Sequence, residues 1–199
     1  MKTRSSSRDR ILDAAEEVVA DLGAGHMTMD AVVARAGLSK GGLIYHFPSL
    51  RALLQAMLKR FIEHTEARIT EARARLPETP ARELKAHIEG WFTLDAKSQS
   101  AQAALLVALS REPSLLKMVR EKRLEIGRAL LAASPDPDRV RILLLAVEGL
   151  WMTELLQLSR YTAKERLQIK HTLLKLADSS LSESKPAPRK KAPPRSRPS

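Results

Sequence analysis

The sequence predicts an all-α fold, and three observations lead to that prediction. Hydrophobic residues make up 44% of the 199 residues, and alanine, leucine, arginine and glutamate, which all favour helices, dominate the chain. Aromatic residues amount to only 4%, and with the β-branched residues they are too sparse for much sheet. Apolar residues recur at helical spacing, and prolines separate the later runs.

The composition excludes several classes of protein. The chain has no cysteine, so disulfides, thiolate metal sites and a cysteine nucleophile are excluded. It has no apolar run of about 18 residues. The polar start MKTRSSSRDR is not followed by an apolar signal core. We therefore expect a cytoplasmic protein that does not enter a membrane.

The net charge of +11 is concentrated near the end of the chain. Residues 1–60 hold nine Lys/Arg against six Asp/Glu, whereas residues 181–199 hold six Lys/Arg against one Glu. Nearly half of the excess positive charge therefore lies in the last 19 residues, and the basic balance is weak evidence that a folded part binds nucleic acid. Residues 182–199 are rich in proline and basic residues, and we expect them to be disordered.

The stretch TMDAVVARAGLSKGGLIYHF, residues 28–47, predicts two short helices joined by a tight turn. Thr28 is a natural N-cap for the first helix, and Val32 and Val33 supply its buried side. Gly37 lies in the turn, where it is free to take a positive φ. Ser39 can cap the second helix. This arrangement is a helix-turn-helix, whose second helix is a candidate to enter the major groove of DNA.

The second helix contains two adjacent glycines, which helix stability alone does not explain. If Leu43 and Phe47 face inward, Gly41, Gly42 and Tyr45 face outward on a helix of about 100° per residue. Each glycine costs roughly 1 kcal/mol against alanine, so a helix selected only for stability would not keep them. A helix whose surface must approach a phosphate or a base edge closely could keep them. The alternative is that the glycines form a loop and no second helix exists.

The rest of the chain divides into a head, a body and a tail. An amphipathic helix that Gly23 ends precedes the helix-turn-helix, and residues 1–47 form the expected DNA-binding domain. Residues 48–181 form a helical effector-binding and dimerisation domain, and 182–199 the tail. The fourth helix is expected from Ser49 to Arg75, and five more make about nine helices in all. These five span residues 81–97, 98–111, 113–133, 138–159 and 163–181.

The N-terminal residues strongly resemble the DNA-binding domain of the TetR family of bacterial transcription regulators. The resemblance covers roughly the first 55 residues and is carried by residues 11–15 (ILDAA), Gly23, Thr28, residues 36–41 (AGLSKG), Leu43, residues 45–47 (YHF), Leu53 and Leu54. The chain departs from the family pattern at Ile44, where tyrosine is frequent, and at Leu50, where lysine is usual. Arg51 can supply the missing charge beside Leu50.

The leading interpretation is a homodimeric, ligand-responsive regulator, a repressor, that binds a palindromic operator in double-stranded DNA. The residues expected at the DNA are Thr28, Ser39, Lys40, Gly41, Gly42, Tyr45, His46 and Arg51, with Thr28, Ser39 and Arg51 at phosphates. Helices eight and nine carry more apolar surface than one protomer easily hides. The resemblance assigns that surface to dimerisation through a four-helix bundle, and a two-fold dimer doubles the base contacts.

The body also offers a candidate effector site, because clefts between helices are common sites for small molecules. The candidate lining residues are Trp91, Phe92, Leu105, Leu106, Leu109, Met118, Trp151 and Met152. Their character predicts a small, mostly apolar effector. The resemblance implies that this effector shifts the dimer between spacings that fit DNA and spacings that do not.

The same sequence also bears on other classes of function. The histidines form no HExxH or other close pair of metal ligands, and no GxSxG elbow or Gly-rich phosphate loop occurs. We therefore expect no enzyme, no cofactor and no metal. The basic tail motivates an alternative, a nucleoid-type protein that binds DNA without sequence preference. A third option is a helical scaffold that binds protein partners through its last two helices.

Overall fold

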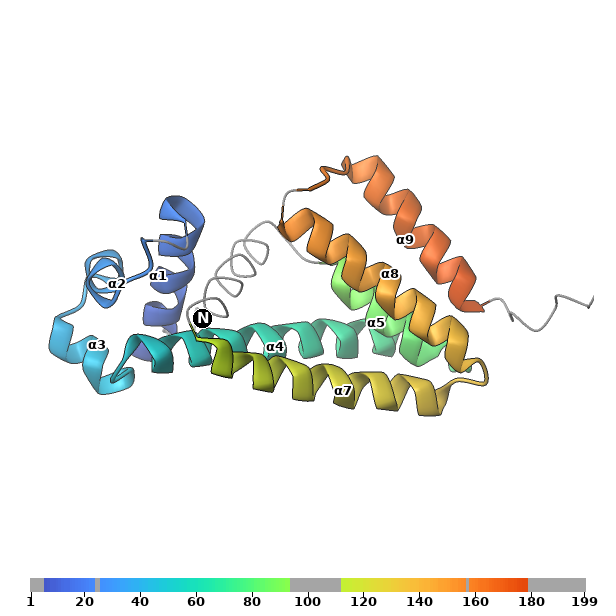
Figure 1. The fold of residues 1–199 in the computed structure, drawn as a ribbon, viewed down its shortest axis with the longest axis horizontal. Helices are drawn as coiled ribbons and strands as arrows, with labels where there is room; N and C mark the ends of the chain where they lie inside the picture. Colours follow the sequence, from blue (N-terminus) through green and yellow to red (C-terminus); the bar gives the residue numbers. More distant parts are fainter. Residues whose placement is uncertain (1–5, 24–25, 94–111, 157, 179–199) are drawn as a thin grey trace, which may run out of the picture.

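The computed structural model describes residues 6–23, 26–93, 112–156 and 158–178, and these residues form helices and their connections without any strand. This confirms the predicted all-α fold. The described elements are α1 (Ser7–Leu22), α2 (Met29–Ala36), α3 (Lys40–His46), α4 (Leu50–Arg75), α5 (Arg82–Phe92), the 3-10 turn η2 (Pro113–Leu115), α7 (Leu116–Ala133), α8 (Pro137–Leu155) and α9 (Ala163–Asp178) (Figure 1). The helix predicted at 98–111, with Leu105, Leu106 and Leu109, lies outside the described residues, as does the tail at 182–199.

Side-chain caps define where the first four helices begin. Ser6, Thr28, Ser39 and Ser49 each have an extended backbone and accept a hydrogen bond from the N–H three residues later. Such a cap contributes about 1 kcal/mol over alanine. Because each cap uses only neighbouring residues, the sequence encodes these four starts locally.

One hydrophobic core joins α1, α2 and α3 to the first half of α4, and we call this unit the head. Its largest fully buried side chains include Ile11, Leu12, Met27, Val32, Leu43, Leu53, Leu54 and Leu58. Burying each such side chain is worth about 1.5–3 kcal/mol. Leu115 of η2 belongs to the same core. The remaining helices, which we call the body, therefore touch the head directly at η2.

A network of ion pairs fixes α1 against α4. Arg60 donates from Nη1 to Oδ1 of Asp13 at 2.8 Å and from Nε to Oε1 of Glu16 at 3.0 Å. Only 12% of the Arg60 side chain is exposed, so salt screens these pairs less than ordinary surface pairs. The network therefore holds α1 and α4 together beside the head core.

The long helix α4 runs from the head into the body, where it packs closely on α5 (Figure 1). Gly90 of α5 lies at a close approach, because a Cβ at that position would be 2.5 Å from Cγ1 of Ile69 on α4. A second core brings α5, α7, α8 and α9 together. Its buried members are Leu84, Ile88, Leu130, Val140, Leu143, Val147, Leu173 and Ala177. A movement of α5 would therefore be passed to α4 through this tight crossing.

Two helices end earlier than the sequence predicts. α5 ends at Phe92, not at Lys97, and α8 ends at Leu155, not at Ser159. After α8 the N–H groups of Leu158 and Ser159 both bond to the carbonyl of Thr153, which closes the helix. Neither helix end has the glycine or proline that usually marks a C-terminus. The predictions therefore relied on apolar spacing alone and made both helices too long.

Candidate DNA interface and effector region

Backbone and side-chain hydrogen bonds hold the turn between α2 and α3. Gly37 adopts the left-handed conformation with φ of 62°, and the N–H of Leu38 bonds to the carbonyl of Val33 at 3.4 Å. Arg10 of α1 donates from Nη2 to the carbonyl of Ala36 at 3.3 Å. The last turn of α2, which leads into the turn before α3, is thus tied to α1.

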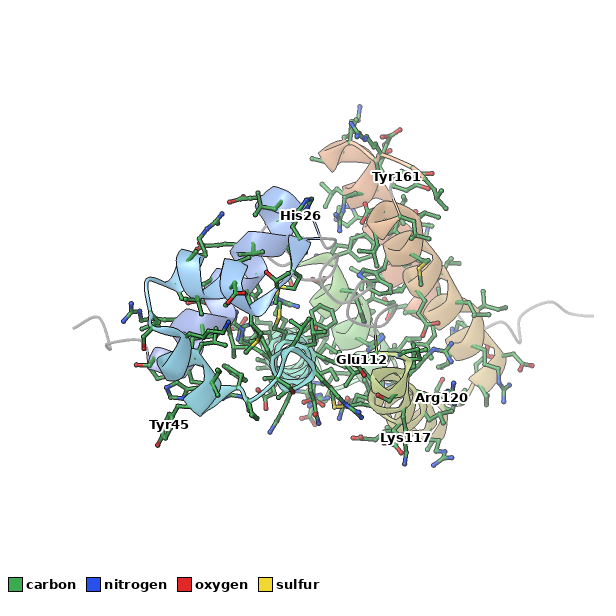
Figure 2. All side chains as sticks on the ribbon, turned by 60° about the vertical axis from the view of Figure 1, so that its left-hand side comes forward. His26, Tyr45, Glu112, Lys117, Arg120 and Tyr161 are labelled. Atoms are coloured by element: carbon green, nitrogen blue, oxygen red, sulfur yellow. The ribbon has the colours of Figure 1, made fainter. Side chains whose placement is uncertain are left out.

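Helix α3 presents one face to the core and the other to solvent, as its spacing predicts. Leu43 and Phe47 are buried, whereas Tyr45 is 84% exposed and projects from the surface of the head (Figure 2). The His46 ring stands edge-on to the Tyr45 ring, with centroids 5.1 Å apart. The guanidinium of Arg8 lies 5.4 Å from the centre of the Phe47 ring, so a cation stands at the C-terminal end of α3.

The outer surface of α3 is open around its two glycines. A Cβ added at Gly41 would meet nothing within 4 Å, and a Cβ at Gly42 would meet only Oγ of Ser39 at 3.3 Å. Neither glycine has a positive φ. The fold therefore does not require glycine at Gly41, although glycine lowers helix stability there. A close approach from outside the protein would explain its presence.

Basic side chains near α3 already have acidic neighbours within the chain. Nζ of Lys40 lies 2.9 Å from Oδ1 of Asp30, and both side chains are largely exposed. Nε of Arg51, at the start of α4, lies 3.8 Å from Oε2 of Glu112, which immediately precedes η2. Exposed pairs of this kind are worth about 0–1 kcal/mol, so either cation can exchange its carboxylate for a phosphate at little cost.

The hydroxyls of Thr28 and Ser39 serve as caps, as described above. Each accepts a backbone N–H at 3.1 Å and retains its own O–H as a donor. Both residues are exposed. The residues predicted at the DNA thus lie on the helix-turn-helix and at the start of α4, and the fold gathers them at one end of the molecule (Figure 1).

In the body, two of the candidate effector residues meet in an aromatic cluster. The rings of Trp91 on α5 and Trp151 on α8 lie edge to face with centroids 5.6 Å apart. Phe61 of α4 approaches the same Trp91 ring at 6.4 Å. Nε1–H of Trp91 donates to Nε2 of His87 at 3.2 Å. The sequence prediction missed Phe61 and His87, although His87 stands four residues before Trp91 on the same helix.

Burial keeps His87 neutral. Burial lowers the pKa of His87 from 6.5 to about 4, and the charge of Glu148 opposes this only in part. Glu148 is itself engaged, because Arg123 of α7 donates to both of its carboxylate oxygens at 2.8 and 2.7 Å. A neutral imidazole can accept the Trp91 hydrogen bond on Nε2. A hydrogen bond within α5 thus orients the Trp91 ring, and a separate ion pair links α7 to α8.

The other described candidate effector residues lie outside this cluster of Trp91, Trp151, Phe61 and His87. Phe92 faces Arg166 of α9, whose guanidinium lies 5.7 Å from the ring centre. Met118 packs against the hydrophobic core of the head. Met152 is 40% exposed on α8. Of the described candidates, Trp91 and Trp151 are therefore the pair that the fold brings into contact through their rings.

Helices α8 and α9 and their connection carry an exposed apolar surface. Its large side chains, each more than a third exposed, are Ile142, Leu145, Met152, Leu156, Leu158, Tyr161, Leu167 and Leu176. Figure 2 shows Tyr161 at one end of this pair of helices. Gly149 lies between Leu145 and Met152 on α8, with open space where a Cβ would be. An apolar surface of this kind is typical of a protein interface.

Within the described residues, no group of three or more His, Cys, Asp or Glu side chains is placed to hold a metal ion. None of the described helices is long and apolar enough to span a bilayer. The part of the chain that the structure describes thus offers a helix-turn-helix, an aromatic cluster and an exposed apolar face as its candidate functional surfaces.

This architecture, a helix-turn-helix head on a helical body, defines a DNA-binding transcription regulator. Residues 11–57 match the family model described as bacterial regulatory proteins of the tetR family, and residues 81–178 match the C-terminal domain described as tetracyclin repressor-like. The chain belongs to the TetR family of transcriptional regulators, as its N-terminal residues predict.

Several known proteins are similar over most of the chain. The HTH-type transcriptional regulator BetI of Stenotrophomonas maltophilia (strain R551-3) is 23% identical over 176 residues, covering 81% of this chain and 88% of BetI. The crystal structure of the multidrug binding protein EbrR complexed with imidazole has a TM-score of 0.62 at 30% identity, covering 87% of this chain and 96% of EbrR. A TetR-family member from Streptomyces coelicolor A3 (SCO1917) has a TM-score of 0.66 at 30% identity, covering 86% and 98%.

Proposed function

We propose that this chain is a homodimeric repressor that binds a palindromic operator through the major groove and is released by a small molecule. The observation that carries the proposal is the outer face of α3. That face is exposed, has open space at Gly41 and carries the projecting ring of Tyr45. A short helix with small residues beside one large side chain can approach base edges closely.

The residues of the helix-turn-helix divide into two roles under this proposal. Thr28, Ser39 and Arg51 contact phosphates and set the register on the duplex. Tyr45 reads a base, and the glycines on α3 let the backbone come close. Lys40 and His46 flank this face. Because α3 carries few hydrogen-bonding groups, part of the specificity comes from the shape of the DNA.

Dimerisation would follow from the exposed face of α8 and α9. A second copy packed on that face would bury the apolar side chains in a four-helix bundle. Two-fold symmetry would then present two copies of α3 to half-sites about one helical turn apart, roughly 34 Å, or a multiple of it. A monomer would offer a single seven-residue helix, with few base contacts.

An effector would act through the aromatic cluster around Trp91. EbrR, which is similar to this chain over 96–98% of its own length, has been crystallised with imidazole, ethidium and malachite green. All three compounds contain aromatic rings, which supports an effector that packs against an aromatic cluster here. Trp91 is one residue from Gly90, where α5 approaches α4 too closely for a Cβ. A ligand that displaced Trp91 would therefore bias the position of α4, and a coupling of about 1–3 kcal/mol would change operator affinity roughly 5–150-fold.

Selection from random DNA tests the regulator proposal against the nucleoid-type alternative. The full-length protein is incubated with duplexes that carry a random central segment, and the bound fraction is amplified and sequenced. We expect an enriched sequence with two-fold symmetry. Binding without any enriched sequence would support the packaging alternative and contradict an operator. Enrichment of a single asymmetric half-site would contradict the dimer.

A further inference from the structure

Ile44 is an exposed apolar residue of α3 that has no role in the function proposed above. Its side chain is 46% exposed and is not among the residues packed on the core of the head, unlike its neighbour Leu43. Among the described residues of the head, only Leu22, Ile44 and Tyr45 are large apolar side chains with this degree of exposure. Two of the three are adjacent on the helix that would meet DNA.

The position of Ile44 on α3 places it beside the open glycine surface. Residues three and four apart are neighbours on a helix, so Ile44 adjoins Gly41 and Lys40. Tyr45, one position further, lies about 100° around the helix axis. Ile44 therefore forms one flank of the face on which Tyr45 is central. Lys40, on the far side of Ile44, can reach a phosphate while Ile44 reaches inward to a base.

The chemistry of Ile44 restricts what it can recognise. Isoleucine has no hydrogen-bond donor or acceptor, so it cannot read the polar edges of bases. The major groove offers one apolar group, the 5-methyl group of thymine. Packing an aliphatic side chain against that methyl group removes apolar surface of both from water. The thymine methyl group is therefore the major-groove group that fits the Ile44 side chain.

From these observations we infer that Ile44 is a specificity-determining residue that packs against the 5-methyl group of a thymine in each half-site, beside the base read by Tyr45. The inference rests on the proposed operator binding. It assigns a base contact at a position where the TetR family frequently has tyrosine, and it predicts a requirement for thymine that no hydrogen bond provides.

Replacing thymine by deoxyuridine tests this directly, because the exchange removes only the methyl group. The probe is the duplex enriched in the selection described above, with each thymine replaced in turn. We expect one position in each half-site at which the wild-type protein loses affinity about three- to ten-fold, the effect of about one buried methyl group. Ile44→Ala should bind both duplexes equally at that position. Tyr45→Phe should keep the wild-type sensitivity there.

Leu22→Ala is the matched control, because Leu22 is a similarly exposed apolar residue of the head that lies on α1. It should leave the whole deoxyuridine profile unchanged. Thermal unfolding checks that the Ile44→Ala variant is folded. We expect it to be, because Ile44 is exposed and its replacement removes little buried surface. The inference is overturned if no position separates Ile44→Ala from wild type. If the selection enriches no sequence at all, the operator proposal itself fails, and the two failures are thereby distinguished.

Discussion

Replacing Gly41 by alanine should raise stability and lower DNA affinity in the same variant. The added Cβ meets no atom within 4 Å in the free protein, and Gly41 has no positive φ. Alanine is about 1 kcal/mol more favourable than glycine inside a helix, although α3 is short and its ends fray. We therefore expect the free energy of unfolding to rise by about 0.5–1 kcal/mol. The same methyl group occupies the surface that base edges must approach.

The expected loss of operator affinity is at least ten-fold, because displacing α3 by the radius of a methyl group weakens every base contact in both half-sites. Urea denaturation followed by circular dichroism measures the first effect, and fluorescence anisotropy with the selected duplex the second. Gly127→Ala is a matched control, because Gly127 is also a helical glycine with open space around its Cβ position but lies on α7. It should be stabilised similarly and bind DNA normally. Full DNA affinity in Gly41→Ala would refute the argument that glycine is kept for close approach.

Three further predictions concern the reading head, the helix crossing and the buried histidine. Tyr45→Ala should weaken binding to the selected duplex by about 1–3 kcal/mol, the usual value of a good base contact, without lowering the melting temperature; unchanged affinity would exclude Tyr45 as a base reader. Gly90→Ala should destabilise the protein by about 1–3 kcal/mol, because its Cβ would lie 2.5 Å from Cγ1 of Ile69; a denaturation midpoint equal to wild type would disprove the tight crossing. His87 binds a proton more weakly in the folded protein (pKa about 4) than in the unfolded chain (6.5), so its contribution to stability is complete above pH 6.5 and falls by about 3 kcal/mol between pH 6.5 and 4. Denaturation at several pH values should show a smaller loss in His87→Gln than in wild type, and equal losses in the two proteins would contradict a neutral buried imidazole.

Local signals in the sequence predicted the head well. Thr28 and Ser39 cap the helices that they were expected to cap, and Gly37 takes the left-handed conformation that the turn requires. The spacing of Leu43 and Phe47 predicted which face of α3 is buried. These features depend on residues within a few positions of one another, so propensity and spacing are sufficient to predict them.

Contacts between distant helices could not be predicted in the same way. Nothing in the sequence indicates that Gly90 would face Ile69, or that Leu115 would complete the core of the head. Met118, a candidate effector residue, also packs on the head core, a contact that the sequence does not indicate, because apolar spacing shows which face of a helix is buried but not which neighbour covers it. The pairing of Arg51 with Glu112 is likewise a product of tertiary structure.

The pairing of Arg51 with Glu112 bears on how the head and the body communicate. Glu112 immediately follows residues 94–111 and immediately precedes η2, whose Leu115 is part of the core of the head. Arg51 occupies the first turn of α4, where a cation can reach a phosphate beside the helix-turn-helix. Operator binding would then exchange one partner of Arg51 for another, at a small electrostatic cost for an exposed pair.

Chemical interference on the selected duplex tests most directly whether two copies of α3 enter the major groove. Dimethyl sulfate methylates guanine N7 in the major groove and adenine N3 in the minor groove, and modified positions that block binding are then mapped. We predict interference at guanine N7 in two clusters about one helical turn apart, or a multiple of it. Interference confined to adenine N3, or a single cluster at guanine N7, would contradict the account.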